Sequence, residues 1–487
     1  MQATRGGPDS TNWATRQNVL PALAAALLLT ACSGSDPEPP PVGGTVPAAT
    51  PQAVCGAGAR PETSYQGRVT QDDWDNGRVE QGFRCNIEMI GSYTVPGLLG
   101  TVGGYKVERY VDAAGHECAY YDTTLLFPSN VFGAEAGVNV MDLSDPTRPV
   151  RVDTLRTAAM LSPHESLVLN TKRGLLAAVL GSPLAYPGAV DIYDLSQDCR
   201  HPVLKATAPL AVLGHESGMS PDGYTLYSAS PGTPTLTPID ISNPALPRPL
   251  TVIPISSHGL GISDDGNRAY VAGVGLKQLD NLGIPTDRGL VILDVSEVQA
   301  RARNPRVREV ARLHWDGIST PQAVIPVTIK GHPYLVEIDE FGAQSRVGAA
   351  RIIDIGDETR PKIISDLRLE VHQPEHFAEQ AADPGAGSTT LAGYAGHYCS
   401  VPRRQDPGIV ACSMILSGLR VFDIRDPYRP REVAYFNAPV IERLITQPGN
   451  WAMSSPAFAP ERREIWYTDA NSGFYVLRLS PDAWPEP

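Results

Sequence analysis

One arrangement of apolar and polar positions recurs along most of the chain. A run of mostly apolar residues reaches an Asp, which is followed by a branched apolar residue, a small or polar residue and a turn that often contains Pro. Such runs end at Asp142, Asp194, Asp240, Asp294, Asp354 and Asp423, and a seventh run has Arg478 in the Asp position. The position recurs every 46 to 69 residues, a spacing typical of four-stranded β-propeller blades with loop insertions.

Further strands are expected around each Asp-ended strand. An outer strand follows most of the turns, at 150–155, 250–255, 307–313, 362–367 and 432–436. Hairpins precede some of the Asp-ended strands, as at 218–228 and 261–271. Both hairpins contain Asp-Gly between alternating apolar residues, which favours a tight two-residue turn. Each repeat therefore has the strands of one blade.

The seventh repeat has no outer strand after it, whereas a strand-like segment at 86–95 has no blade of its own. Pairing this segment with the strand at 474–479 would remove two exposed sheet edges at once. We therefore predict an all-β, seven-bladed β-propeller whose ring is closed by an N-terminal strand in the last blade.

The repeat resembles the LVIVD repeat of bacterial extracytoplasmic β-propeller lipoproteins, most clearly at Gly289-Leu-Val-Ile-Leu-Asp294. The resemblance covers about residues 84–480. It implies the propeller fold and says little about activity, because one fold carries many functions. The repeated Asp is interpreted as structural, since an Asp before a Ser-Asp-Pro type of turn caps backbone N–H groups.

The first residues have the features of an export signal. Arg5 and Arg16 precede an uncharged apolar run at 20–31, which is too short to span a bilayer comfortably. Leu29-Thr30-Ala31-Cys32 resembles the bacterial lipobox, which implies cleavage before Cys32 and lipidation of that residue. We predict a lipoprotein signal peptide at 1–31, a lipidated Cys with a flexible linker and N-terminal extension at 32–83, and the propeller at 84–481. Ser33 after the lipidated Cys implies sorting to the outer membrane of a Gram-negative cell envelope.

Charge and cysteine content narrow the possible partners and the compartment. The formal net charge is −13, with no basic stripe, which argues against nucleic acid as a partner. Six cysteines remain besides Cys32, and an even number in an exported protein indicates disulfides. The pairs expected are Cys399–Cys412, then Cys55–Cys85, then Cys118–Cys199.

Histidines recur at one position of the repeat, the start of the innermost strand. His164, His215, His258 and His397 occupy it in four blades, and Thr320-Pro-Gln322 and Gly449-Asn450-Trp451 stand there in two others. Because innermost strands surround the propeller axis, the four imidazoles should converge, with Glu165 and Glu216 beside them. Such a set can bind a transition metal such as copper or zinc, or supply a general base. Alternatively, each His bonds a loop of the adjacent blade and acts only as a structural tie.

A long segment between the fifth and sixth repeats contains two more histidines, His372 and His376. They could donate to the same ion if the chain becomes helical from Pro374 onwards, or the segment is an ordinary solvated loop. Copper-dependent propeller oxidases related to selenium-binding proteins place His in a similar way. This chain lacks their signatures, so the similarity is an analogy only.

Two functions follow from these patterns. The first is a lipid-anchored binding or scaffolding module that presents a propeller face to a protein, glycan or small molecule. The alternative is a metal-dependent, copper-like oxidoreductase that uses the four repeat histidines, with Glu165 or Glu216 as the base. The lipid anchor would attach either one to the membrane.

Overall fold

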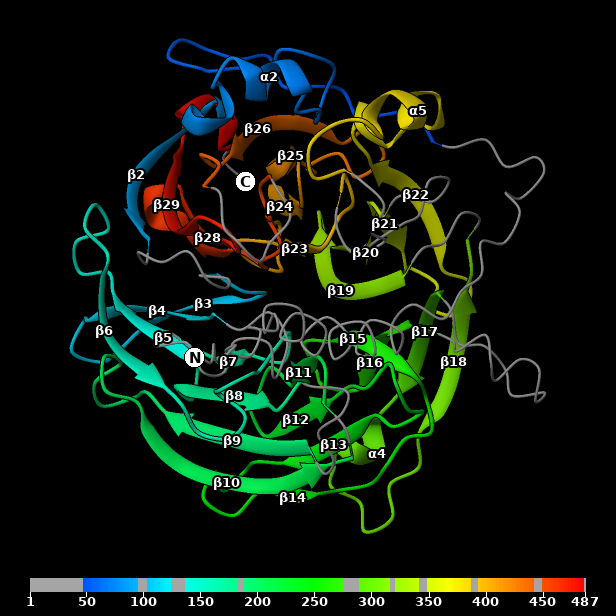
Figure 1. The fold of residues 1–487 in the computed structure, drawn as a ribbon. Coiled ribbons are helices and arrows are strands. Elements are labelled where there is room, and N and C mark those ends of the chain that lie inside the picture. The colour runs from blue at the N-terminus through cyan, green and yellow to red at the C-terminus, as the bar shows by residue number, and fades with distance from the viewer. Residues whose placement is uncertain are drawn as a thin grey trace, which may run out of the picture.

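The computed structural model describes residues 47–94, 103–123, 136–181, 188–212, 214–274, 289–315, 320–340, 348–386, 393–441 and 449–485. Within these ranges, seven antiparallel sheets surround one axis, each forming one blade (Figure 1). The predicted all-β, seven-bladed propeller is therefore confirmed. The predicted signal peptide and the predicted lipidation site, Cys32, lie outside the described residues.

The strands of each blade follow one another from the innermost to the outermost position. Blades one to four are formed by β3 (Val107–Val111), β4 (Glu117–Asp122), β5 (Val138–Asp142) and β6 (Val150–Leu155); β7 (Val168–Asn170), β8 (Leu175–Val179), β9 (Gly188–Asp194) and β10 (Val203–Ala211); β11 (Ser217–Met219), β12 (Thr225–Ser228), β13 (Thr237–Asp240) and β14 (Arg248–Pro249); and β15 (Ser257–Ile262), β16 (Arg268–Gly273), β17 (Gly289–Asp294) and β18 (Arg308–Leu313). Blades five to seven are formed by β19 (Thr320–Ile329), β20 (His332–Glu340), β21 (Ala350–Asp354) and β22 (Lys362–Leu367); β23 (Tyr398–Ser400), β24 (Ile409–Met414), β25 (Gly418–Asp423), β26 (Arg431–Asn437) and β1 (Phe83–Cys85); and β27 (Ala457–Ala459), β28 (Glu464–Asp469), β29 (Gly473–Leu479) and β2 (Ile87–Tyr93).

Within the described ranges, helices are few and short. They are α2 (Gln71–Asp75), α4 (Ser296–Gln299) and α5 (Phe377–Gln380), with 3-10 turns η1 (Val79–Gln81), η2 (Glu370–His372), η3 (Pro374–His376), η4 (Pro460–Arg462) and η5 (Pro481–Ala483). No helix in the described part of the chain combines the length and apolarity needed to cross a bilayer.

The ring closes as predicted. Strand β2 pairs antiparallel with β29, with Ile87 opposite Leu479 and Tyr93 opposite Phe474. In addition, β1 pairs with β26 and gives blade six a fifth strand, which the sequence did not lead us to expect. The N-terminal part of the described chain therefore contributes to two neighbouring blades.

The outer strand of blade three differs from the prediction. It covers only Arg248–Pro249, and Ile253 forms an isolated bridge with Leu236. Pro249 and Pro254 have no N–H group to donate, so the ladder is interrupted, although the N–H groups of Leu250 and Ile253 still donate across it, each at 2.9 Å. The bounds predicted for this strand, 250–255, are wrong.

The Asp residues that end the third strands have a structural role. Each accepts a hydrogen bond from the backbone N–H two residues further on, at 2.8 to 3.1 Å, as predicted; the six are Asp142, Asp194, Asp240, Asp294, Asp354 and Asp423. The predicted hairpin turns are also present, with Gly223 and Gly266 in the left-handed region at φ of 73° and 77°.

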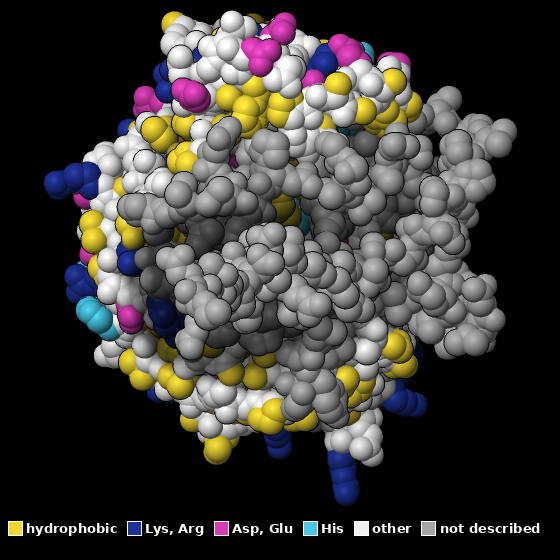
Figure 2. All heavy atoms as spheres, viewed as in Figure 1, with side chains coloured by type: hydrophobic (Ala, Val, Ile, Leu, Met, Phe, Trp, Pro, Cys, Tyr) yellow, Lys and Arg dark blue, Asp and Glu magenta, His cyan; other side chains and the backbone are white. Residues whose placement is uncertain are grey.

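Apolar side chains fill the spaces between neighbouring blades. One such cluster joins blades seven and one, where Trp466 and Phe474 pack with Tyr121 and Met141, all fully buried. Around the rim, Lys, Arg, Asp and Glu side chains lie among apolar ones (Figure 2).

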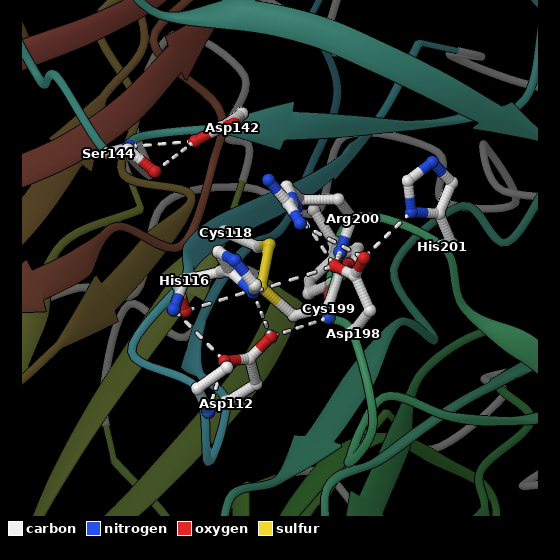
Figure 3. Close-up of a disulfide and its surroundings, with 11 residues drawn as sticks. Asp112, His116, Cys118, Asp142, Ser144, Asp198, Cys199, Arg200 and His201 are labelled. Atoms are coloured by element: carbon white, nitrogen blue, oxygen red, sulfur yellow. Dashed lines mark hydrogen bonds and ion pairs between the residues drawn. A yellow bond between two sulfur atoms is a disulfide. The ribbon is translucent and has the colours of Figure 1, made fainter.

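All three predicted disulfides are present, Cys55–Cys85, Cys118–Cys199 and Cys399–Cys412. Figure 3 shows that Cys118–Cys199 joins β4 to the segment after β9. The Asp112 carboxylate next to it accepts hydrogen bonds from the backbone N–H of Cys199 and of His116, at 3.0 and 2.9 Å. This bridge therefore ties blade one to blade two.

The extension before the propeller packs against blade six (Figure 1). Arg420 of β25 is fully buried and forms ion pairs with Glu62 of the extension and with Glu432 of β26, both through buried carboxylates. Glu432 also accepts hydrogen bonds from the Ala53 N–H and from Gln66, at 3.1 and 3.0 Å. The extension is thus attached through a buried polar network.

Thr70→Ala should destabilise the extension by about 1 kcal/mol. Thr70 caps α2: its hydroxyl accepts the Asp73 N–H at 3.2 Å, and the Asp73 carboxylate accepts the Thr70 N–H at 2.9 Å. Hydrogen exchange of the α2 amides would measure the loss. Thr70→Ser keeps the hydroxyl and should leave the exchange rates unchanged; equal loss in both variants would contradict a capping role.

Candidate metal centre at the propeller axis

The four repeat histidines lie together at the axis, as predicted from their common position. His164, His215 and His397 stand just before β7, β11 and β23, and His258 lies in β15. All four are buried, with 6, 6, 3 and 0% of the surface of His164, His215, His258 and His397 exposed. We define the axial cluster as His164, Glu165, His215, Glu216, His258, Glu340 and His397.

The imidazoles point their Nε2 atoms at the same small volume. His215 Nε2 lies 3.0 Å from His258 Nε2. The Glu165 carboxylate lies among all four rings, with an oxygen 3.4 Å from Nε2 of His215, His258 and His397 and 3.7 Å from that of His164. Glu165 is therefore the shared neighbour of the four histidines.

A second carboxylate, Glu340, completes the centre. It ends β20 and lies 2.9 Å from His258 Nε2 and 3.4 Å from His397 Nε2. The sequence analysis missed this residue. The strand register could have revealed it, because in an antiparallel pair the end of the second strand lies opposite the start of the first. Indeed, Glu340 pairs with Thr320, at the start of the innermost strand of blade five.

Two of the rings are oriented through their other nitrogen. His397 Nδ1 lies 2.7 Å from the Met453 carbonyl oxygen, to which it donates, so its Nε2 lone pair faces the axis. His258 Nδ1 lies 3.5 Å from Glu216, whose other oxygen lies 3.0 Å from Lys106 Nζ. A ring nitrogen held by a carboxylate or carbonyl is the usual support of a metal-binding histidine.

Burial controls the protonation of the cluster. It lowers the pKa of His215 and of His397 well below the usual value, so these rings are neutral. Burial acts in the same direction on His258, but the carboxylates of Glu340 and Glu165 outweigh it and raise its pKa well above the usual value. Burial raises the pKa of Glu165 to about 8. Neutral imidazoles are the form that binds metal ions.

The spacing of the donor atoms fits an ion. Neighbouring ligands of a tetrahedral ion with bonds of about 2.0 Å lie about 3.3 Å apart. The close contacts between histidine nitrogens and the oxygens of Glu165 and Glu340 span 2.9 to 3.7 Å. Three groups of potential ligands with mutually close donor atoms occur here, and Glu165 belongs to each of them.

The backbone at His164 supports the idea of a site. His164 follows Pro163 and has φ of 52°, in the left-handed region. A side chain other than glycine in this region costs of order 1 kcal/mol or more and persists only where the surroundings impose it. Gly181 makes room for it, since a Cβ there would lie 2.5 Å from the His164 Cβ.

His372 and His376 lie apart from the axial cluster. The chain does turn helical from Pro374, as considered above, through η3 and α5. However, His372 is buried and accepts the Leu369 N–H on Nδ1 at 3.1 Å, while the His376 ring stacks on Tyr65 of the extension at 4.0 Å. Neither belongs to a group of metal-ligand type among the described residues.

One further acidic group, Asp112, His116 and Asp198, lies around the Cys118–Cys199 disulfide (Figure 3). Its oxygens already accept hydrogen bonds: Asp112 binds backbone N–H groups, and Asp198 binds Arg200 and His201 at 2.9 and 3.0 Å. This group is explained by its role in the turn.

The fold and the centre together define a propeller with a buried set of imidazole and carboxylate donors on its axis. The periplasmic gluconolactonase PpgL of Pseudomonas aeruginosa shares the fold, with 12% identity and a TM-score of 0.50 over 79% of this chain and 93% of that chain. Putative 6-phosphogluconolactonases of Bacteroides uniformis and Bacteroides fragilis match with 11 and 14% identity and TM-scores of 0.48 and 0.46; they cover 72 and 74% of this chain and 89 and 93% of theirs. At these identities the similarity concerns the fold alone.

No family model and no curated protein sequence matches the chain. The resemblance to the LVIVD repeat therefore stays a prediction.

Proposed function

We propose that this protein is a metal-dependent enzyme of the cell envelope, with a divalent transition-metal ion held by the axial cluster. The observation that carries the proposal is the convergence of four buried Nε2 atoms on the Glu165 carboxylate, at 3.4 to 3.7 Å. The donors are nitrogen and oxygen, which suit iron, zinc, manganese or copper(II) better than the sulfur ligands that select copper(I).

The cost of burying these groups favours a site over a structural tie. Glu165, Glu216 and Glu340 expose 2 to 3% of their surface, and the four histidines little more. Burying ionisable groups costs several kcal/mol per ion unless the partners compensate fully. Histidines that only tie neighbouring blades together need one acceptor each and no shared carboxylate. A cation at the centre gives these groups a common partner.

Glu216 and Lys106 have a supporting role in this proposal. Lys106 Nζ lies 3.0 Å from Glu216 and 4.0 Å from the centre of the Tyr398 ring, which holds the ammonium in place. Glu216 in turn orients His258. Glu165, which faces all four Nε2 atoms, is placed as a ligand, and its use as a base, like that of Glu216, remains a prediction.

We propose a redox reaction class, because two imidazoles and one carboxylate, as in His215, His258 and Glu165, form the donor set of non-haem iron oxygenases. The metal, when bound, would supply the electron transfer. The protein residues would hold the ion, keep His215 and His397 neutral and exclude bulk water from the buried donors.

Metal analysis of the full chain, purified without chelator, tests both the bound metal ion and the redox reaction class. We expect at least one equivalent of iron or copper per chain. Stoichiometric zinc alone would overturn the redox class and leave a metalloenzyme. A protein without stoichiometric transition metal, which also takes up none of iron, copper, zinc or manganese on addition, would overturn the proposed function.

The binding or scaffolding function stays the second proposal, because propeller faces present many loops to a partner. A binding or scaffolding module does not require the buried charges at the axis, so the metal analysis distinguishes it from the metal-dependent enzyme. For either function, the resemblance of Leu29–Cys32 to a lipobox supports a lipid anchor. The three disulfides support export to an oxidising compartment.

A further inference from the structure

The two carboxylates at the axis, Glu165 and Glu340, each divide their oxygens between the same two pairs of histidines. Glu165 Oε2 lies 3.4 Å from Nε2 of both His215 and His258. Glu165 Oε1 lies 3.7 Å from His164 Nε2 and 3.4 Å from His397 Nε2. The carboxylate thus faces one pair of imidazoles with each of its oxygens.

Glu340 repeats this division. Its Oε1 lies 2.9 Å from Nε2 of His258, in the first pair, and its Oε2 lies 3.4 Å from Nε2 of His397, in the second pair. Each pair of imidazoles therefore has one oxygen from each carboxylate. Two sets of two nitrogens and two oxygens result, and the carboxylates join them.

Each set also contains a buried oxygen without a hydrogen bond. Among the described residues, Glu165 Oε2 in the first set and Glu340 Oε2 in the second accept none, although both side chains are almost completely buried. A buried carboxylate oxygen without a donor costs free energy. Glu165 Oε2 faces the first pair of imidazoles and Glu340 Oε2 faces His397 of the second, so each set has one unmatched oxygen that a bound cation would compensate.

The number of donors also exceeds what one ion can use. The four imidazoles and the two carboxylates present eight donor atoms, whereas a first-row transition-metal ion binds four to six. Paired ions in enzymes lie about 3.5 to 4 Å apart, a separation that the two oxygens of one carboxylate can span. Four protein donors per ion leave positions open for substrate.

We infer that the axial cluster holds two divalent transition-metal ions bridged by Glu165 and Glu340, one bound by His215 and His258 and the other by His164 and His397. This inference rests on the proposed function, because it assigns the number and arrangement of the ions in that site.

Manganese(II) is the probe for the test, because its six-line electron paramagnetic resonance signal weakens when two ions couple at short distance. The full chain, stripped with a chelator and dialysed, is titrated with manganese(II). We expect two ions per chain, with loss of the six-line signal as the second ion binds. One ion per chain would overturn the inference and leave the proposed function intact, whereas no binding of this or any other transition metal would overturn both. Two ions with undiminished six-line signals would overturn the bridge.

Variants assign the ions to the two sets. Glu165→Gln keeps the size of the side chain and removes its charge, so it should bind one ion in place of two. His164→Gln and His215→Gln each remove one nitrogen from a different set and should each retain one ion, which keeps the test open if Glu165→Gln does not fold. Glu375→Gln, an exposed residue of η3, is the matched control and should bind two. Retention of two ions in all three cluster variants would contradict the assignment.

Discussion

Arg420→Met should lower the free energy of unfolding by about 3 to 5 kcal/mol, because it leaves two buried carboxylates without a cation. The side chains of Arg420, Glu62 and Glu432 are all fully buried. Burial already raises the pKa of Glu62, and Arg420 counteracts that rise. Without the guanidinium, the carboxylates of Glu62 and Glu432 are buried with no cation beside them, which weakens the attachment of the extension to blade six. Chemical denaturation would measure the loss, and trypsin cleavage after Arg68 or Arg78 would report the detachment.

Arg148→Met is the matched control for this variant. Arg148 pairs with Asp145 at 2.9 Å, but its side chain is 83% exposed. Exposed ion pairs contribute about 1 kcal/mol or less, so this variant should unfold almost as the original protein does. A loss below about 1 kcal/mol in Arg420→Met would show that the network does not hold the extension. Replacing Glu62 and Glu432 by Gln in the Arg420→Met background should recover part of the stability.

The double variant His215→Ala, His258→Ala should lose more than about 100-fold in affinity for the ion that these two residues bind. Mutation of a residue that only supports a metal ligand commonly costs 10- to 100-fold in metal affinity. His215 and His258 are expected to cost more, because they supply the nitrogen atoms themselves, which lie 3.0 Å apart at the centre. His258 also contacts Glu165, Glu216 and Glu340, so its loss removes the partner of three carboxylates. Competition with a chromophoric chelator, measured on the full chain, would give the affinity.

The control for the double variant is His201→Ala, His376→Ala. His201 is 71% exposed and pairs with Asp198, and His376 stacks on Tyr65. This control should bind metal with unchanged affinity. A similar affinity in both double variants, with both proteins folded by circular dichroism, would show that the repeat histidines only connect blades.

The sequence was sufficient to bring His164, His215, His258 and His397 together. A repeat makes each position equivalent by rotation about one axis, so residues far apart in sequence are placed in a ring without any knowledge of contacts. The same reasoning found β2 as the partner of β29, because the seventh repeat had an unpaired edge.

Glu340 and Lys106 were not predicted, for two different reasons. Glu340 ends a second strand, and only the strand register, opposite Thr320, shows that such an end reaches the axis. Lys106 belongs to the segment before β3 and approaches Glu216 from two blades away, a contact that no local pattern encodes.

The segment at His372 and His376 shows the limit of local spacing. A separation of four residues suggested a shared ligand, but the neighbours of the segment decide where its rings point. Val371 N–H donates to the Gln66 carbonyl, and Arg368 donates to the Thr50 side chain, so the segment packs on the extension. The extension carries no repeat, and its position could not be deduced from one.

We expect the pairing of β2 with β29 to form late in the folding of the molecule. The two strands flank nearly the entire propeller sequence, and closing so long a loop is slow compared with forming local hairpins. Blades one to six each contain four consecutive strands that can pair locally, whereas blade seven has three and needs β2 from the other end of the propeller sequence. A chain that crosses a membrane unfolded would therefore first form an open arc, with the edges of β2 and β29 unpaired. We expect these edges to join last, because their pairing closes the longest loop, and the axial donors to reach their final places at that step.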